Sequence, residues 1–106
     1  MYAIRVGLSA PAGTAEPAEP AVRSALSALL RMAGARLEHA RFRSAPGELS
    51  GVCFLAAGSL LEAERLLGHA CRVLTVPFGP LAGWRLERCE ADPWIALGLH
   101  EAPAEN

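Results

Sequence analysis

Residues 49–74, LSGVCFLAAGSLLEAERLLGHACRVL, contain the clearest structural signals in the chain. Residues 49–57 are apolar on both faces of an extended chain, which is typical of a strand that is covered on both sides. Ser59 and Glu62 then form an S-x-x-E capping box, a usual start of a helix. Apolar residues follow at helical spacing, at positions 60, 63, 67, 70, 71 and 74. This part of the chain therefore predicts a buried strand followed by an amphipathic helix.

The residues before it predict a strand, a loop and another helix. Apolar and polar residues alternate over 2–9, as in a strand with one face on a core. Residues 10–20 are rich in proline and predict either a lid or a mobile loop. Residues 21–33 show helical periodicity, with Pro20 at the helix start and Gly34 just past its end.

Two further strands are expected on either side of the capped helix. Residues 36–43 alternate, but Leu37 and Phe42 fall on opposite faces, so the pattern leaves the core-facing side of this strand open. Residues 84–89 alternate as well and predict the fourth strand. Residues 91–106 are expected to form a C-terminal extension.

The order of these elements is β-α-β-β-α-β within one predicted domain, residues 1–106. This order predicts an α+β, ferredoxin-like fold in which two helices cover one face of a four-stranded antiparallel sheet. We expect the helices to cover Ile4, Val6, Val52, Phe54, Trp84 and Leu86. The open face would then present Arg5, Cys53, Leu55, Arg85 and Glu87. If Phe42 faces the core, the open face also presents His39, Arg41 and Arg43. A second copy that covered this face would enclose a cavity between the two sheets.

Composition narrows the classes of partner. Ten basic residues against eleven acidic ones leave a formal charge of −1, without the positive excess that binding to duplex DNA needs. RNA-recognition modules of this topology need stacking aromatics on the open face of the third strand, where Cys53 and Leu55 are expected, so no nucleic-acid partner is predicted. The longest apolar run, residues 51–58, is far shorter than a membrane span. The chain also lacks a basic segment followed by an apolar one at its start. We therefore expect a soluble, cytoplasmic protein without a membrane partner.

The residues that carry reactive chemistry are few. Lysine is absent, which removes Schiff-base chemistry. Cys53, Cys71 and Cys89 are odd in number and form no CxxC pair, which argues against a disulfide framework or a structural zinc site. His69 and Cys71 point in different directions on a helix and make a poor metal pair, so no metal is predicted. No cofactor is predicted either. Cys53 is interpreted as a core residue, with a nucleophile activated by Arg5 as the less favoured alternative.

Segments of the second half resemble a known superfamily. These are SLLEAE at residues 59–64 and VLTVPFGPL at 73–81, which leads into WRLERC at 84–89. They resemble the dimeric α/β-barrel superfamily, and the nearest members are the muconolactone isomerase-like and YCII-related proteins. The resemblance implies a homodimer that pairs its open sheet faces. Members of the superfamily include isomerases, polyketide cyclases, small monooxygenases and proteins without known activity. YCII-related proteins are expected to pair a histidine with an aspartate; because the only aspartate here is Asp92 in the tail, no catalytic residue is carried over.

The candidate site residues belong to the expected cavity. His39 is the catalytic candidate, because a neutral imidazole can move a proton near pH 7; the alternative is an exposed histidine on an edge strand. The predicted ligand-binding residues are Arg5, Arg41, Arg85, Leu55 and Trp84. The arginines would converge on a carboxylate or phenolate, or else form surface salt bridges with Glu38 and Glu87. Trp84 would line the apolar part of the cavity, or else belong to the core or to a dimer contact.

These features lead to three functional hypotheses. The first is a small homodimeric enzyme that isomerises or cyclises a small, apolar, anionic metabolite in a catabolic or secondary-metabolite pathway. The second is a non-catalytic ligand-binding or scaffold protein of the same fold. The third is a cofactor-free monooxygenase in which His39 assists a substrate that activates oxygen itself.

Overall fold

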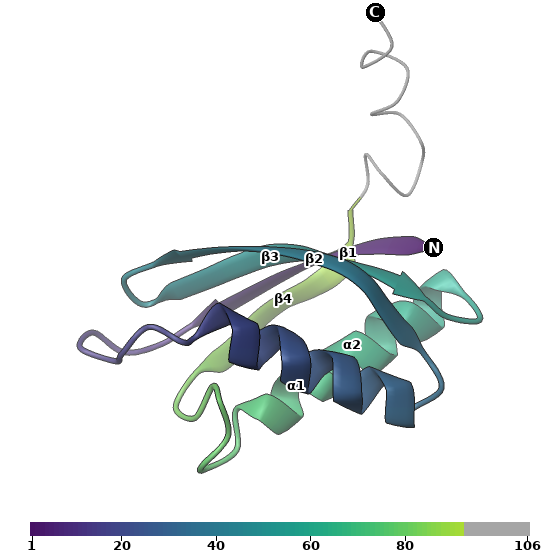
Figure 1. Cartoon of the computed structure of the whole chain (residues 1–106). Coiled ribbons are helices and arrows are strands. Elements are labelled where there is room, and N and C mark those ends of the chain that lie inside the picture. Colours follow the sequence, from purple (N-terminus) through teal and green to yellow (C-terminus); the bar gives the residue numbers. More distant parts are fainter. Residues whose placement is uncertain (93–106) are drawn as a thin grey trace, which may run out of the picture.

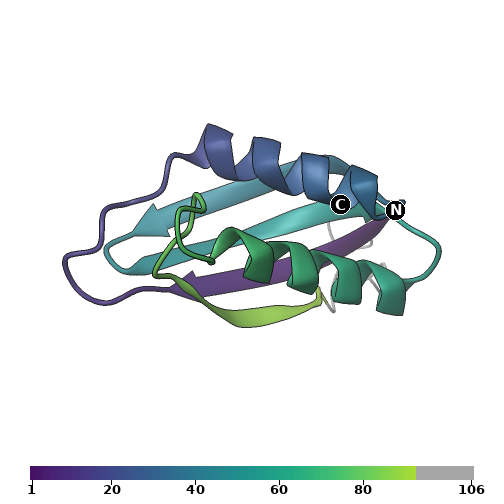
Figure 2. The same ribbon diagram turned by 90° about the horizontal axis from the view of Figure 1, so that it is seen from below.

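Four strands and two helices make up the part of the chain that the computed structural model describes, residues 1–92 (Figure 1). In chain order they are β1 (Tyr2–Ser9), α1 (Glu19–Met32), β2 (Arg36–Ala45), β3 (Glu48–Ala56), α2 (Leu60–Leu74) and β4 (Arg85–Ala91). The strands form one sheet in the order β2-β3-β1-β4, and each neighbouring pair is antiparallel. Both helices lie side by side on the same face of the sheet (Figures 1 and 2). The predicted α+β, ferredoxin-like βαββαβ fold is confirmed.

The capping box begins α2 as predicted. The Ser59 hydroxyl oxygen accepts a hydrogen bond from the Glu62 N–H at 3.1 Å. The Glu62 carboxylate reaches back and accepts a hydrogen bond from the Gly58 N–H at 2.8 Å. The Glu62 N–H, which the helix start leaves without an intrahelical partner, and the Gly58 N–H just before the cap are therefore both satisfied by local side chains.

The ends of α1 also follow from the sequence. The helix begins at Glu19, so Pro20 lies in its first turn, where the missing N–H costs nothing. At the other end Gly34 adopts a φ of 90°, and the Ala35 N–H donates to the Leu30 carbonyl at 2.9 Å. This left-handed ending terminates the helix cleanly and turns the chain into β2. The predicted loop 10–20 is accordingly two residues shorter in the structure, and whether it closes over a ligand stays a prediction.

The register of the sheet corrects the predicted faces of β3. Cys53 lies opposite Ile4, and both are fully buried beneath the helices. Leu55 faces the same way and is 0% exposed, whereas Val52 and Phe54 point to the open face. The expected assignment of this strand is therefore wrong by one residue. A strand that is apolar on both sides carries no signal that tells its faces apart, so the neighbouring strand decides.

Bulges explain why the faces of β2 and β4 were hard to predict. In β2 the register shifts between Leu37 and His39, which leaves Glu38 as an extra residue. Leu37 and Phe42 therefore both lie on the helix side, although simple alternation places them on opposite faces. Because Phe42 packs against the core, His39, Arg41 and Arg43 face outward as predicted.

A second bulge shifts the alternation of inward and outward side chains along β4. Leu86 lies opposite Leu8, and Arg88 lies opposite Gly7, so Glu87 is the extra residue. Trp84, Leu86 and Cys89 consequently face the helices, and Arg88 faces outward, although simple alternation groups Arg88 with Leu86.

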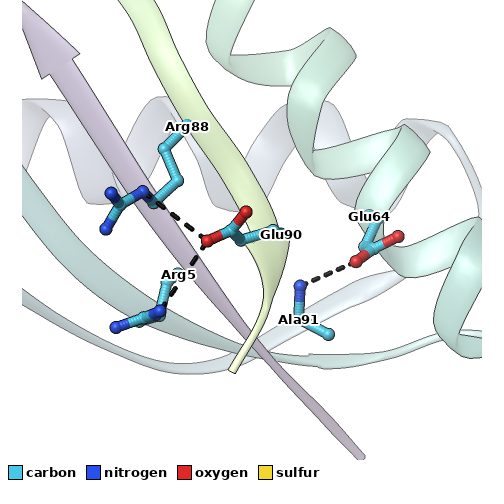
Figure 3. Close-up of polar contacts among 5 residues, drawn as sticks. All are labelled: Arg5, Glu64, Arg88, Glu90 and Ala91. Carbon is cyan, nitrogen blue, oxygen red and sulfur yellow. Dashed lines mark hydrogen bonds and ion pairs between the residues drawn. The ribbon is translucent and has the colours of Figure 1, made fainter. Parts of the chain in front are cut away.

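A side chain from each helix contacts an outer strand at the sheet margin. The Arg23 guanidinium of α1 donates to the Ala40 carbonyl of β2 at 3.2 Å, and its charge lies over the Phe42 ring at 5.9 Å. On the opposite margin the Ala91 N–H of β4 donates to the Glu64 carboxylate of α2 at 2.7 Å (Figure 3). These contacts fasten both helices to the strands that form the edges.

Beyond β4, the Asp92 N–H donates to the Ala3 carbonyl at 2.9 Å and continues the pairing with β1 by one residue. The predicted extension 91–106 thus begins inside the sheet, and its remainder, 93–106, lies outside the described residues. Within residues 1–92, neither helix is both long and apolar enough to cross a membrane. The cytoplasmic location stays a prediction.

Candidate anion site on the open sheet face

The face of the sheet opposite the helices carries most of the charged side chains that the strands contribute. The register places its residues in rows that run across all four strands. One central row contains Arg41, Val52, Arg5 and Glu90, in the order β2-β3-β1-β4. The adjacent row contains Arg43, Ser50, Gly7 and Arg88. Four guanidinium groups and one carboxylate therefore share two neighbouring rows.

These four arginines also line one concavity. Its volume is about 650 Å³, and Arg5, Arg41, Arg43 and Arg88 contribute to its wall together with Ser50 and Val52. At the β2 margin the same concavity takes in Glu19 and Arg23 of α1. Its size falls in the range of pockets that hold small organic ligands.

The Glu90 carboxylate lies between two of the arginines, Arg5 and Arg88, and forms a hydrogen bond with neither (Figure 3). One of its carboxylate oxygens lies 3.7 Å from Nη2 of Arg5 and 3.6 Å from Nε of Arg88. Both distances are ion-pair distances and are longer than a hydrogen bond. Nε of Arg5 is enclosed, and no hydrogen-bond acceptor reaches it among the described residues. Each guanidinium has five N–H donors. Arg5 and Arg88 therefore still have N–H groups that could donate to a ligand with two oxygens, such as a carboxylate.

An apolar surface lies beside the arginine rows. Phe54 and Val52 of β3 are half-buried on the open face, and the His39 ring lies over Phe54 with a centroid distance of 5.8 Å and an angle of 39°. His39 and Arg41 are two residues apart on the same strand and face, a spacing of about 7 Å. The rings are therefore next to the charged rows in the sheet, but neither His39 nor Phe54 lines the concavity of the four arginines; His39 lines a separate one of about 400 Å³ with Leu37 and Glu38.

Three of the predicted site residues come together as expected. His39, Arg5 and Arg41 all lie on the open face, in two adjacent rows. His39 has the ring contact with Phe54, but neither a hydrogen bond nor an ion pair in the described part of the chain. Arg41 likewise forms no ion pair with a described residue.

The other predicted ligand-binding residues lie elsewhere. Leu55 is fully buried against the helices, and Trp84 is 6% exposed in the same core, so the predicted open-face position of Leu55 is wrong and Trp84 follows its core alternative. Arg85 lies on the open face two rows from Arg5, opposite Ser9. Its Nε donates to the Glu87 carboxylate at 3.2 Å, which matches the salt-bridge alternative.

Glu87 itself is held in its charged form by this small network. The Ser9 hydroxyl donates to the Glu87 carboxylate at 2.5 Å, and the Arg85 guanidinium lies on the same oxygen. These hydrogen bonds, with the charge of Arg85, lower the pKa of Glu87 below its ordinary value. Arg85 is therefore paired with Glu87, away from the rows that contain Arg5 and Arg41.

The site includes residues that the sequence pattern did not single out. Phe54 was expected to face the helices, because β3 is apolar on both faces. Arg88 was not assigned to either face, and the bulge that turns it outward has no marker in the sequence. Arg43 was assigned to the open face but not to the ligand. Only the alternation of polar side chains along β2 gave a usable signal, since His39, Arg41 and Arg43 at every second position mark an outward face.

The register also removes the reason for excluding RNA. The expected Cys53 and Leu55 face the helices, and Phe54 occupies the open face of β3. RNA-recognition modules stack two or three bases on aromatics from two strands. Among the described strand residues, Phe54 is the only phenylalanine, tyrosine or tryptophan on this face; Tyr2, for example, lies opposite Leu55 on the helix side. A single aromatic residue is fewer than such a module uses.

The three cysteines are free thiols held in or against the core. Burial is the main cause that raises the pKa of Cys53 to about 12 and that of Cys89 to about 11, and burial also raises the pKa of Cys71. Arg5 points to the opposite face of the sheet from Cys53, so it does not stabilise a thiolate there. The core interpretation of Cys53 is therefore favoured over the nucleophile. Residues 1–92 contain no cluster of three or more metal-ligating side chains.

Comparisons with known proteins add no identification. No family model, no curated protein and no solved structure matches the chain. The resemblance to the dimeric α/β-barrel superfamily accordingly stays a prediction.

Proposed function

We propose that the protein is a small enzyme that binds a small, apolar carboxylate on the open sheet face and isomerises or cyclises it. The observation that carries the proposal is the charge balance of the site: four arginines share two rows with a single carboxylate, Glu90. Sites with this excess attract anions, and the planar guanidinium fork matches a carboxylate. The nearby Phe54 and Val52 supply a surface for the apolar part of the ligand.

The arginines have two roles in this proposal. Arg41 forms no ion pair with a described residue, and the accessible Nη2 of Arg5 has only a 3.7 Å contact with Glu90, so both gain hydrogen bonds when a ligand oxygen arrives. Fixed positive charge also stabilises an enolate when a proton leaves the ligand, because the charges are in place before the reaction begins. Ligand orientation and charge stabilisation therefore come from the same rows.

His39 is the proposed proton shuttle. It lies in the row next to Arg41 and Arg5, and its ring packs on Phe54, where the apolar part of the ligand would lie. A neutral imidazole accepts a proton at one nitrogen and donates at the other, so one side chain can return the proton to a different carbon.

One observation favours non-catalytic ligand binding as the second candidate. A catalytic histidine is commonly oriented by a hydrogen bond at its other ring nitrogen. Within residues 1–92, His39 has no such partner. Binding and turnover therefore need separate experiments.

The binding experiment uses benzoate, the simplest rigid apolar carboxylate, as the probe. We expect Arg41→Gln and Arg5→Gln each to weaken benzoate binding about tenfold or more, because a hydrogen bond to a charged group contributes roughly 1.5–3 kcal/mol. Isothermal titration calorimetry measures the effect. Arg65→Gln, an exposed arginine on α2, is the matched control and should bind as the natural chain does. Equal affinities in all four proteins would contradict the assigned site.

The turnover experiment uses levulinate, a keto carboxylate with exchangeable C–H groups beside its ketone. We expect the protein to accelerate exchange of these protons with D2O, and His39→Gln to reduce that acceleration about a hundredfold or more while levulinate affinity is kept. Proton NMR follows both. Acceleration that survives His39→Gln would refute the role of His39, and affinity without acceleration in the natural chain would support the binding-protein alternative.

A further inference from the structure

The apolar part of the open face forms a row that ends beside the C-terminal end of β4. His39 of β2, Phe54 of β3 and Ala3 of β1 are register partners across three strands. The Asp92 N–H donates to the Ala3 carbonyl at 2.9 Å, so Asp92 extends this row onto the fourth strand. Asp92 is also the last described residue, and the chain therefore continues from the edge of this row.

This row and the neighbouring Val52 offer an apolar surface that is only partly covered. Phe54 and Val52 are half-buried, and both helices lie on the other face of the sheet, so neither helix covers these two side chains (Figures 1 and 2). Full burial of a valine or phenylalanine side chain contributes roughly 1.5–3 kcal/mol, and part of that contribution remains available here. A segment that lay over the row would therefore be held by apolar contact.

The sequence beyond β4 matches this surface in hydropathy. Pro93 has no N–H group to donate, so ladder pairing cannot continue at this residue. Residues 94–99 read WIALGL and contain four large apolar side chains and no charge. In an extended chain alternate residues share a face, so Ile95, Leu97 and Leu99 would lie together on one side.

Residues 100–106 match the arginine rows in charge. They contain Glu101 and Glu105 and no arginine, whereas the two central rows hold four arginines and the single carboxylate of Glu90. Glu101 continues the two-residue spacing of positions 95, 97 and 99, so an extended segment presents its apolar side chains and this carboxylate on the same side. Both the hydropathy and the charge of the segment therefore complement the open face.

The segment is also long enough to cross the sheet. Neighbouring strands lie about 4.8 Å apart, so β4 and β2 are separated by roughly 15 Å. An extended chain advances about 3.3 Å per residue, so the nine residues that follow Asp92 span up to roughly 30 Å. Glu101 can therefore reach the arginines of β2, as well as those of β1 and β4, while the apolar residues before it lie over Phe54.

We propose that residues 94–101 dock across the open sheet face of their own chain, with apolar side chains on Phe54 and Val52 and with Glu101 among the arginine rows. Because the occupant belongs to the same chain, its local concentration is high, and a small apolar area is enough to hold it. A separate protein would need about 800 Å² of contact on each side for a stable complex. The inference does not depend on the proposed function.

The test is NMR spectroscopy of the full chain labelled with ¹³C. We expect nuclear Overhauser effects between the methyl groups of Ile95, Leu97 and Leu99 and the ring protons of Phe54, because such effects arise only between protons in near contact. Methyl groups with effects only to residues of their own segment would overturn the inference. A mixture of labelled and unlabelled chains identifies the source of the segment, and effects that pass between chains would assign it to a second copy and overturn the inference as well.

Leu97→Ser and Leu61→Ser make a matched pair of variants. Leu97 lies in the proposed contact, whereas Leu61 is a leucine of α2 that is 73% exposed. We expect Leu97→Ser to lose the effects from Ile95 and Leu99 to Phe54, and Leu61→Ser to keep them. Loss of these effects in both variants, or in neither, would contradict the contact made by Leu97.

Benzoate binding connects the segment to the proposed function. A carboxylate ligand and the segment would compete for the arginine rows, so the apparent affinity of the natural chain is reduced in proportion to the share of molecules whose face is uncovered. We expect Leu97→Ser to bind benzoate at least about threefold more tightly than the natural chain in titration calorimetry. Equal affinities would contradict the position of the segment over the arginine rows. Benzoate that binds neither protein sinks the proposed function, while the effects between methyl groups and ring still decide the docking.

Discussion

Raising the pH from 7 to 10 should destabilise this protein by about 2 kcal/mol for each fully buried cysteine. Cys53 is 0% exposed, and burial raises its pKa to about 12; Cys71 is also buried, and its pKa is raised for the same reason. In the unfolded chain a thiol loses its proton at about pH 8.5. Between pH 8.5 and 10 the unfolded chain therefore releases protons that the folded chain retains.

The direction of this change in the free energy of unfolding follows from proton binding. A group whose pKa is raised by folding contributes its full stability below the unfolded pKa, and this contribution declines as pH rises toward the folded pKa. The free energy of unfolding should thus be level from pH 7 to about 8 and fall steadily above that. Cys89, whose pKa burial raises to about 11, adds to the same decline. Few other groups titrate between pH 8 and 10, because the chain has no lysine and one tyrosine.

The measurement is urea unfolding at several pH values, with a reducing agent present throughout. The control is Cys53→Ala combined with Cys71→Ala. This variant loses some stability at every pH because its core is smaller, but its dependence on pH should be shallower than that of the natural chain. A slope that is the same in both proteins would show that these thiols do not cause it.

Replacing Gly51 by alanine should cost about 3 kcal/mol, a large effect for one methyl group. A Cβ at this position would overlap the Arg41 carbonyl oxygen and would lie 2.7 Å from a ring carbon of Phe42. The Phe42 ring occupies the space that a side chain would need, and the carbonyl belongs to the backbone of β2. This overlap can be removed only if β2 moves or if Phe42 loses its contact with the core.

Gly7→Ala is the matched control, because Gly7 is also a strand glycine. Its Cβ would meet the Arg88 side chain at 3.6 Å, which is ordinary contact. We expect this variant to change stability by less than about 1 kcal/mol, with a slight gain from the stiffer unfolded chain. Thermal or urea unfolding compares the two. Equal stabilities would contradict the packing of Phe42 over Gly51.

The sequence predicts the element order because its signals are local. The Ser59 and Glu62 capping box and the left-handed Gly34 each act within a few residues, so they can be recognised without tertiary contacts. The strand faces depend on pairing instead. β3 is apolar on both sides, and only its register with β1 shows that Leu55 faces the core and Phe54 the open face.

The candidate site was predicted in part for the same reason. Arg5, Arg41 and His39 were found because polar residues alternate on their strands with apolar ones. Arg88 was missed because an extra residue in β4 reverses the phase after it, and a bulge has no marker in this stretch of sequence. Trp84 was assigned to the ligand as a large aromatic, a residue type that is common both in cores and at interfaces, and it lies in the core.

The contacts at the two sheet margins have a consequence for aggregation. An incoming strand extends a sheet through an unbroken series of outward N–H and C=O groups. Here Arg23 already holds the Ala40 carbonyl, and Glu64 already holds the Ala91 N–H. Bulges at Glu38 and Glu87 interrupt the two margins further. Growth of open-ended cross-β fibrils is thereby disfavoured at both edges, which leaves self-association of the folded chain to closed assemblies of limited size.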